Sequence, residues 1–206
     1  MKSFRFLSLL LAIALPGIAT ANTTYSVTVN TTPLAGGAGY LAIDLVGGTP
    51  LQSNLATLSG FTTTGILGST SLSGDVTGTL NPGPLILKAD QFFNEDLQAI
   101  TFLSGLTSFT LNLTTSYIPA SAPDSFAFYL LNSSFVPYAT SDPTGANSLF
   151  DIDLVGASTA PQVFSSTFAT ATVVPQSQVP EPQSAALLTL ALAILGAAYR
   201  IFRPGL

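Results

Sequence analysis

The chain has 206 residues, of which 47% are hydrophobic and 7% are charged, and it contains no cysteine, histidine or tryptophan. Soluble domains average about 25% charged residues, so this charged fraction is low. Residues 22–179 contain one base, Lys88, and all of the acidic residues except Glu181. Phosphate binding requires Lys and Arg side chains, so this composition argues against a nucleic-acid partner. The absence of cysteine excludes disulfide bonds, thiol catalysis and thiolate metal sites.

The N-terminal 21 residues have the features of a signal peptide. Two basic residues lie within the first five positions, and an apolar stretch follows from residue 6 to residue 15. Ala19 and Ala21 are the small residues that a signal peptidase requires before its cleavage site. The apolar stretch is too short to cross a hydrocarbon core of about 30 Å. We therefore predict a signal peptide over residues 1–21, with cleavage before Asn22.

Period-two alternation dominates residues 22–174. Three stretches carry apolar side chains at every second position: Tyr25, Val27 and Val29; Phe109, Leu111 and Leu113; Phe126, Phe128 and Leu130. Glycine, proline and asparagine separate such stretches at short intervals. This pattern predicts an all-β fold, a single antiparallel β-sandwich of jelly-roll-like type. In the third stretch Ala127 and Tyr129 occupy the other face, so that strand is expected to be covered on both sides.

Two segments need separate interpretations. The segment ADQFFNEDLQAI (89–100) is the one stretch outside the two ends with a trace of a 3.6-residue apolar period, and it is expected to hold a helical turn or two. The segments AIDLVGG (42–48) and DIDLVGA (151–157) resemble each other, although their surroundings do not. We interpret them as two strands with the same inward and outward positions, with a duplicated half-domain as the alternative.

Asp151 and Asp153 form the best candidate for a catalytic carboxylate pair. Residues two apart on one strand face the same way, at a backbone distance of about 6.6–6.8 Å. Paired carboxylates serve glycoside hydrolysis, but they must flank the sugar ring, and here both come from one strand. The simpler interpretation is a pair of solvated aspartates, and the sequence predicts no enzymatic activity and no catalytic residue.

The same region offers oxygen ligands for a calcium ion. Asp142, Asn147, Asp151 and Asp153 could share such a site, because Ca²⁺ binds carboxylate and amide oxygens. The segment lacks the spacing of an EF-hand loop, and Asp142 to Gly145 fits a β-turn with Asp at its first position. Apart from this candidate calcium, no cofactor is predicted.

A carbohydrate ligand would need exposed aromatic rings beside carboxylate or amide groups. The tyrosines that could supply such rings are Tyr40, Tyr117, Tyr129 and Tyr138. The alternative is that these tyrosines belong to the core or to strand edges. The sequence leaves both interpretations open.

The C-terminal part is predicted to be a linker followed by a membrane segment. Residues 175–182 are rich in Pro, Gln and Ser, and Pro180 and Pro182 keep the backbone extended. Residues 183–206 are expected to form a transmembrane helix and a basic tail, because no charge interrupts residues 184–199. Arg200 and Arg203 follow the apolar stretch, which places the C-terminus in the cytoplasm and residues 22–174 outside it.

The C-terminal segment resembles the PEP-CTERM sorting signal of exopolysaccharide-producing Gram-negative bacteria. The resemblance rests on the motif Val179, Pro180, Glu181 and Pro182, on the apolar helix and on the terminal Arg200 and Arg203. The blocks FFNEDLQAITF, APDSFAFYLL and TSDPTGANSLFDIDL are similar to a PEP-CTERM subfamily that is defined by sequence alone. The resemblance implies export across the inner membrane, transient anchoring there, recognition by an exosortase, removal of the tail and delivery to the cell surface or extracellular matrix.

The expected function is therefore that of a non-enzymatic surface or matrix protein associated with exopolysaccharide or biofilm. Its expected partners are signal peptidase and exosortase during export, then exopolysaccharide, with no nucleic acid. Two alternatives stay open: a carbohydrate-binding module, and a β-sandwich protein anchored permanently in the inner membrane.

Overall fold

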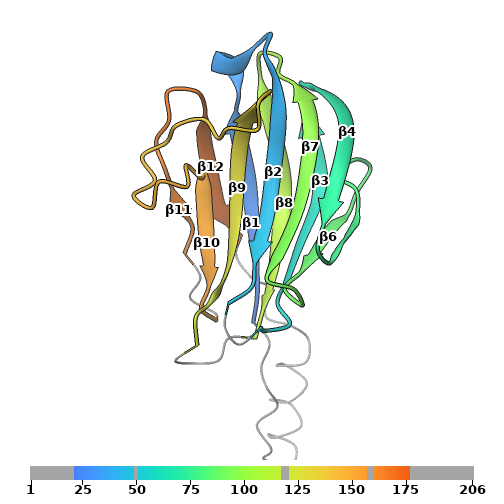
Figure 1. Ribbon diagram of the computed structural model, residues 1–206, viewed down its shortest axis with the longest axis vertical. Helices are drawn as coiled ribbons and strands as arrows, with labels where there is room; N and C mark the ends of the chain where they lie inside the picture. Colours follow the sequence, from blue (N-terminus) through green and yellow to red (C-terminus); the bar gives the residue numbers. More distant parts are fainter. Residues whose placement is uncertain (1–20, 49–50, 117–120, 157–159, 177–206) are drawn as a thin grey trace, which may run out of the picture. The chain divides into compact units, whose positions relative to one another are not determined.

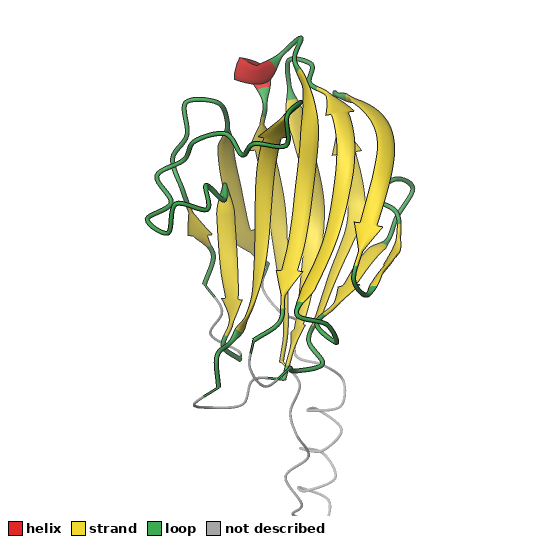
Figure 2. Cartoon of the chain, in the orientation of Figure 1, coloured by secondary structure: helices red, strands yellow, loops and turns green. Residues whose placement is uncertain are grey.

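The computed structural model of the chain describes residues 21–48, 51–116, 121–156 and 160–176. These residues form two antiparallel six-stranded sheets, which lie face to face (Figure 1). The predicted all-β sandwich is confirmed. Its one helical element in these ranges is a short 3-10 turn, η1 (Thr32–Leu34), after the first strand (Figure 2). None of the described segments forms a helix with the length and hydropathy of a membrane span.

Each sheet combines strands that are distant in the sequence. The first sheet has the order β12-β1-β8-β3-β6-β5, with the bounds β1 Ala21–Asn30, β3 Leu55–Thr63, β5 Val76–Gly78, β6 Leu85–Lys88, β8 Leu106–Thr115 and β12 Thr170–Pro175. The second sheet has the order β11-β10-β9-β2-β7-β4, with the bounds β2 Ala38–Val46, β4 Ile66–Ser73, β7 Phe93–Thr101, β9 Asp124–Asn132, β10 Phe150–Leu154 and β11 Gln162–Val163.

The core lies between the two sheets, where the alternating apolar residues meet. The predicted inward positions are buried: Tyr25, Val27 and Val29 of β1, Phe109, Leu111 and Leu113 of β8, and Phe126, Phe128 and Leu130 of β9. On the other face of β9, Ala127 is also buried and Tyr129 is half-buried. The prediction that this strand is covered on both sides is confirmed.

The helical turn expected within residues 89–100 is wrong, because residues 93–101 form the strand β7. This strand reverses the usual alternation: Asn94, Asp96 and Gln98 point inward and are buried, whereas Leu97 on the outer face is only half-buried. Gln98 Nε2 donates to the Gly68 carbonyl at 2.9 Å. Asp96 accepts a hydrogen bond from Thr70 Oγ1, although its Oδ2 atom is buried without a partner. Because the inward positions of β7 are mostly polar, the sequence lacks the period-two pattern of apolar residues that predicts a strand.

The similarity between segments 42–48 and 151–157 does reflect equivalent strand positions. In β2, Ile43 and Leu45 are fully buried, and in β10, Ile152 and Leu154 are fully buried. The aspartate between each pair of apolar residues lies on the outer face of the second sheet. The interpretation as two strands with the same inward and outward positions is confirmed.

Several predicted signals lie outside the described residues. These are Ala19 with the rest of the signal peptide before residue 21, the motif residues Val179, Pro180, Glu181 and Pro182, the transmembrane segment 183–206, and the basic residues Arg200 and Arg203. Ala21 and Asn22, which flank the predicted cleavage bond, are the first two residues of β1. The sandwich therefore begins where the mature chain is expected to begin.

Candidate functional site

A row of carboxylates crosses the outer face of the second sheet. In the strand register Asp151 lies opposite Ala127, Ala127 lies opposite Asp44, and Asp44 lies opposite Glu95. Residues directly opposite one another in an antiparallel pair point to the same face, so all three carboxylates lie on the outer side. We call Asp44, Glu95 and Asp151 the carboxylate row. Like charges directly opposite each other destabilise a sheet, and Asp44 and Glu95 form such a pair.

Asp44 is the most deeply buried member of the carboxylate row. Its side chain is only 8% exposed, and its Oδ1 atom has no hydrogen-bond partner. Burial, followed by the negative charge of Glu95, raises the pKa of Asp44 to about 7. Burying an ionised carboxylate without a hydrogen-bond donor costs free energy. Ionised Asp44 therefore destabilises the folded protein when no ligand is bound.

The other two members are perturbed in the same direction. Burial, then the charges of Asp153 and Asp142, raise the pKa of Asp151 to about 6, and the Oδ1 atom of Asp151 also lacks a partner. Burial and the neighbouring Asp96 raise the pKa of Glu95. The row therefore concentrates charge that the described part of the chain does not neutralise, since its only base, Lys88, lies on β6 of the first sheet.

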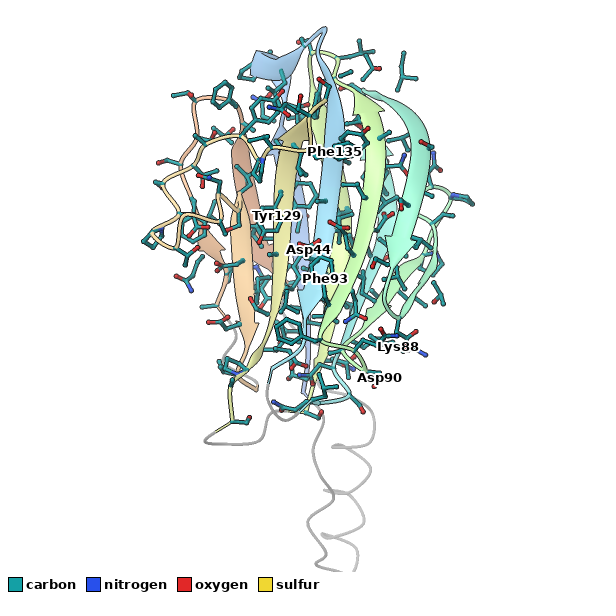
Figure 3. All side chains as sticks on the ribbon, in the orientation of Figure 1. Asp44, Lys88, Asp90, Phe93, Tyr129 and Phe135 are labelled. Carbon is teal, nitrogen blue, oxygen red and sulfur yellow. The ribbon has the colours of Figure 1, made fainter. Side chains whose placement is uncertain are left out.

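Two of the four candidate tyrosines lie on the same outer face. Figure 3 shows Phe135, Tyr129, Asp44 and Phe93 following one another along the second sheet. Burial, then the charges of Asp44, Asp142 and Asp151, raise the pKa of Tyr129 to about 12, which places its hydroxyl within the field of the carboxylate row. Tyr40 stacks on Phe135, with ring centroids 4.5 Å apart.

Tyr138 does not join this face. Tyr138 packs against the hydrophobic core and against Phe168, at a centroid distance of 4.9 Å. Tyr117 lies outside the described residues. Tyr129 lies on the second face of its strand, as the alternation predicted, whereas Tyr138 follows the alternative of a packed tyrosine.

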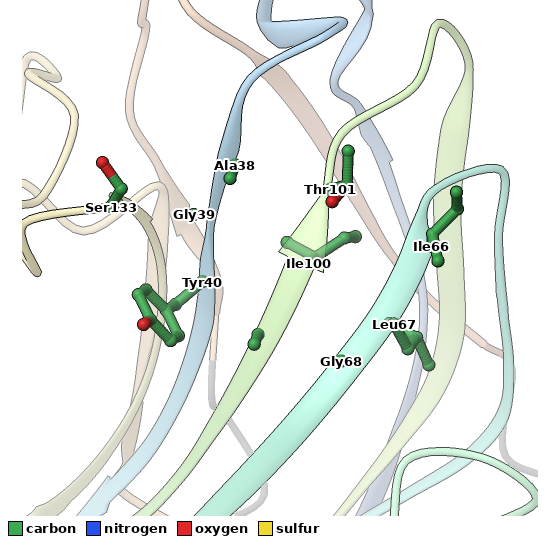
Figure 4. Close-up of a pocket in the computed structure, with 10 residues that line it drawn as sticks. Ala38, Gly39, Tyr40, Ile66, Leu67, Gly68, Ile100, Thr101 and Ser133 are labelled. Carbon is green, nitrogen blue, oxygen red and sulfur yellow. The ribbon is translucent and has the colours of Figure 1, made fainter.

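A shallow pocket of about 220 Å³ lies beside Tyr40, across β2, β7 and β4. Gly39, Ala99 and Gly68 line it, between the ring of Tyr40 on one side and Ile66 on the other (Figure 4). These small residues leave the sheet surface low between two larger side chains. The pocket therefore lies beside the stacked rings of Tyr40 and Phe135.

The predicted calcium ligands belong to β10 and to the loop that precedes it. No three His, Cys, Asp or Glu side chains of the described segments form a group that could hold a metal ion. Asp151 and Asp153 lie on the outer side of β10, but the Oδ1 atom of Asp151 is buried and has no hydrogen-bond partner, unlike that of a fully solvated aspartate. Asn147 instead serves its own loop, because its Oδ1 accepts a hydrogen bond from the Thr140 amide at 3.2 Å.

Asp142 holds the loop that precedes β10. Its carboxylate accepts four hydrogen bonds, from the backbone amide and hydroxyl of Thr144 and from the amide and hydroxyl of Ser148. The Gly145 amide donates to the Asp142 carbonyl at 3.2 Å, which confirms the predicted β-turn. Burial alone raises the pKa of Asp142, but the hydrogen bonds from Thr144 and Ser148 outweigh it and bring the pKa below its ordinary value.

Asp142→Ala is expected to lower the free energy of unfolding at neutral pH by roughly 1–3 kcal/mol, because it leaves the loop donors without their acceptor. The lowered pKa means that the stabilisation is present above the ordinary carboxylate pKa and is lost as the pH falls through the folded value. Urea unfolding of the variant and the wild type at neutral and acidic pH measures both effects. An unchanged unfolding midpoint at neutral pH would show that Asp142 does not hold the loop.

Asp44 and Glu95 are the site residues that the sequence analysis missed. The similarity between segments 42–48 and 151–157 was the available signal, because it aligns Asp44 with Asp153 on an outer face. The sequence did not show that β9 lies between β2 and β10, or that Glu95 lies opposite Asp44. Those facts depend on pairing between distant strands.

A second surface has the opposite character. The outer face of the first sheet carries hydroxyl and amide side chains in rows across β12, β1, β8 and β3, and these four strands contain no charged residue. We call this surface the hydroxyl face; it includes Asn22, Thr24, Ser26, Thr28, Thr57, Ser108, Thr110, Asn112, Thr114 and Thr172. Neighbouring strands are linked through it, since Thr114 Oγ1 donates to Asn22 Oδ1 at 2.7 Å.

Comparison of the chain with family models, with curated proteins and with solved structures gives no match. The functional assignment therefore depends on the sequence signals and on the two outer faces.

Proposed function

We propose that the protein is a non-enzymatic, exported surface or matrix protein that associates with exopolysaccharide. The signal peptide and the resemblance of the C-terminal segment to a PEP-CTERM signal support its export and its recognition by an exosortase. In this proposal signal peptidase removes residues 1–21, and the sandwich is carried across the inner membrane. The tail is then removed, and the protein reaches the cell surface or extracellular matrix.

The observation that carries the proposal is the hydroxyl face. Hydroxyl and amide groups exchange hydrogen bonds with water or with sugar hydroxyls at little net cost, and the absence of charge avoids the penalty of desolvating ions. A broad, uncharged and hydrogen-bonding sheet surface suits contact with a hydrated polysaccharide. The four strands that form it contain no Asp, Glu, Lys, Arg, His or Cys.

The strand order supports a further part of the proposal, a jelly-roll topology. The orders β1-β8-β3-β6 in the first sheet and β2-β7-β4 in the second match seven strands of two interleaved Greek keys, whereas β5 pairs with β6 in the first sheet instead of completing the second. Lectin domains use the jelly-roll architecture. In this view β9 to β12 are additions at the margins of an eight-stranded jelly roll. A jelly roll is compatible with sugar binding, but the fold alone does not identify a binding site.

The proposal is tested by affinity electrophoresis of the protein through gels containing the exopolysaccharide purified from the producing bacterium. Wild-type protein is expected to be retarded. The double variant Thr28→Glu/Thr110→Glu is expected to lose about tenfold in affinity, because contact would bury unpaired charges. Ser104→Glu, in an exposed loop outside the face, changes the net charge by half as much and should leave retardation unchanged.

Wild-type migration that is the same with and without the polysaccharide would contradict the association. Equal retardation of the wild type and the Thr28→Glu/Thr110→Glu variant would exclude the hydroxyl face as the contact surface.

A further inference from the structure

The carboxylate row lacks a positive partner although its central member is buried. Asp44 is only 8% exposed, its Oδ1 atom is unpartnered, and the register points its side chain into the row opposite Glu95. A cation beside a buried carboxylate is attracted more strongly than one beside an exposed carboxylate, because solvent screens the pair less. The row is therefore a place where a positively charged ligand gains more than it would elsewhere on the surface.

The spacing of the row favours several separate positive groups over one metal ion. Asp44 and Asp151 are two strand spacings apart, with Ala127 between them, which is roughly 9–10 Å between backbones. Calcium binds its oxygens at about 2.3–2.6 Å, and the described residues contain no group of three such side chains that could hold a metal. An extended ligand with repeated cationic groups matches this arrangement better.

Aromatic rings accompany the row along the same face. Tyr129 lies close enough to Asp44 and Asp151 to feel both charges, and Phe93, which is 41% exposed, comes next to them along the sheet (Figure 3). The face of an aromatic ring attracts an ammonium group and also covers an apolar ring surface such as the C–H face of a sugar. A ligand that combines sugar rings with amino groups uses both features.

We propose that the carboxylate row of Asp44, Glu95 and Asp151, with Tyr129 beside it, binds the protonated amino groups of an amino-sugar polysaccharide. This inference rests on the proposed association with polysaccharide and specifies the class of polymer that the second sheet selects. Each ammonium group pairs with one carboxylate, and a sugar ring between them packs on Tyr129. The hydroxyl face then contacts the same polymer without regard to its charge.

The test is isothermal titration calorimetry of the protein with a glucosamine hexamer at neutral pH, where Asp151 is largely ionised and an ammonium group beside Asp44 favours its ionised form. The fully N-acetylated hexamer, which has the same rings without positive charge, is the matched ligand control. Asp44→Asn and Asp151→Asn are each expected to weaken binding of the glucosamine hexamer by about tenfold, the typical effect of losing one charge-assisted contact. Asp90→Asn removes the same charge from an exposed loop outside the row and should bind as the wild type does.

The expected result is binding of the glucosamine hexamer, sensitivity to Asp44 and Asp151 but not to Asp90, and weaker binding of the N-acetylated hexamer. Tyr129→Ala should also weaken binding of the glucosamine hexamer, and by a larger factor than it weakens binding of spermine, a polycation without sugar rings, because spermine loses only the contact between ammonium and ring. Equal effects of Asp44→Asn and Asp90→Asn would reduce the interaction to net charge and overturn the proposal. Equal binding of the two hexamers would overturn it as well.

The electrophoresis experiment separates this inference from the proposed function. Retardation by exopolysaccharide without binding of the glucosamine hexamer contradicts the carboxylate-row site and leaves the association intact. Site-specific binding of the hexamer without retardation contradicts the association with that exopolysaccharide and supports the site.

Discussion

Asp44→Asn is expected to stabilise the protein at pH 8, by up to about 4 kcal/mol. Burial and Glu95 raise the pKa of Asp44 from 3.8 to about 7, so the folded chain holds this proton more tightly than the unfolded chain does. The wild type therefore loses stability as the pH rises from about 4 through about 7. A difference of roughly three pKa units corresponds to about 4 kcal/mol, and asparagine removes the ionisation that causes the loss.

Urea unfolding at pH 8 and at pH 4 measures this effect. At pH 4 the Asp44 carboxyl is largely protonated in the folded state, so the variant and the wild type should differ much less than at pH 8. Asp90→Asn, in an exposed loop, should change stability by no more than about 0.5 kcal/mol at either pH. A variant that is less stable than the wild type at pH 8 would show that Asp44 has a stabilising partner in the folded protein.

A gain in stability together with a loss of binding would mark Asp44 as a functional residue. Proteins commonly retain groups that destabilise the free state where a ligand later compensates them. Asp44→Asn therefore reads out both the stability and the binding role of one carboxylate. The two measurements are independent, because unfolding is followed without ligand.

Phe128→Ala is expected to lower the free energy of unfolding by about 3–5 kcal/mol. The Phe128 ring is fully buried and lies between the sheets. It contacts Phe150 of its own sheet at a centroid distance of 5.5 Å and Phe109 of the first sheet at 5.8 Å. Alanine leaves a cavity at the point where both sheets meet, and it also removes two aromatic contacts worth about 0.5–1.5 kcal/mol each.

Phe92→Ala is the matched control, because the Phe92 side chain is 66% exposed and its loss should change stability by no more than about 0.5 kcal/mol. Equilibrium unfolding in urea, with the slope of the transition compared between variants, separates a loss of stability from a change in the unfolded state. Similar unfolding midpoints for Phe128→Ala and wild type would mean that the sheets do not pack through this ring.

The sequence predicted β1, β8 and β9 from their apolar faces. Tyr25, Val27 and Val29 alternate with small polar residues, and a half-buried strand is the structure that such a period of two satisfies. The strand β7 was not predicted, because its inward positions include Asn94 and Gln98, which form their hydrogen bonds inside the fold. Patterns of hydrophobicity do not reveal polar groups that are paired only after distant strands meet.

The candidate site was predictable in its parts but not in its assembly. Asp151 and Tyr129 were recognised as outer-face residues from strand periodicity alone. The carboxylate row needs β10, β9, β2 and β7 in that order, and the order follows from long-range pairing that one sequence does not show. Asp142 differs, because its partners Thr144 and Ser148 lie within six residues of it in the sequence. The turn from Asp142 to Gly145 could therefore be predicted from local residues.

Export and removal of the tail are tested by the intact mass of the protein recovered from the inner membrane, the outer membrane and the growth medium of the producing bacterium. We expect a species at the surface or in the medium that begins at Asn22 and lacks the residues after about Pro182. A species that still extends to Leu206 and occurs only in the inner membrane would contradict it. The apolar segment would then be a permanent anchor, and the proposed delivery to the matrix would be wrong.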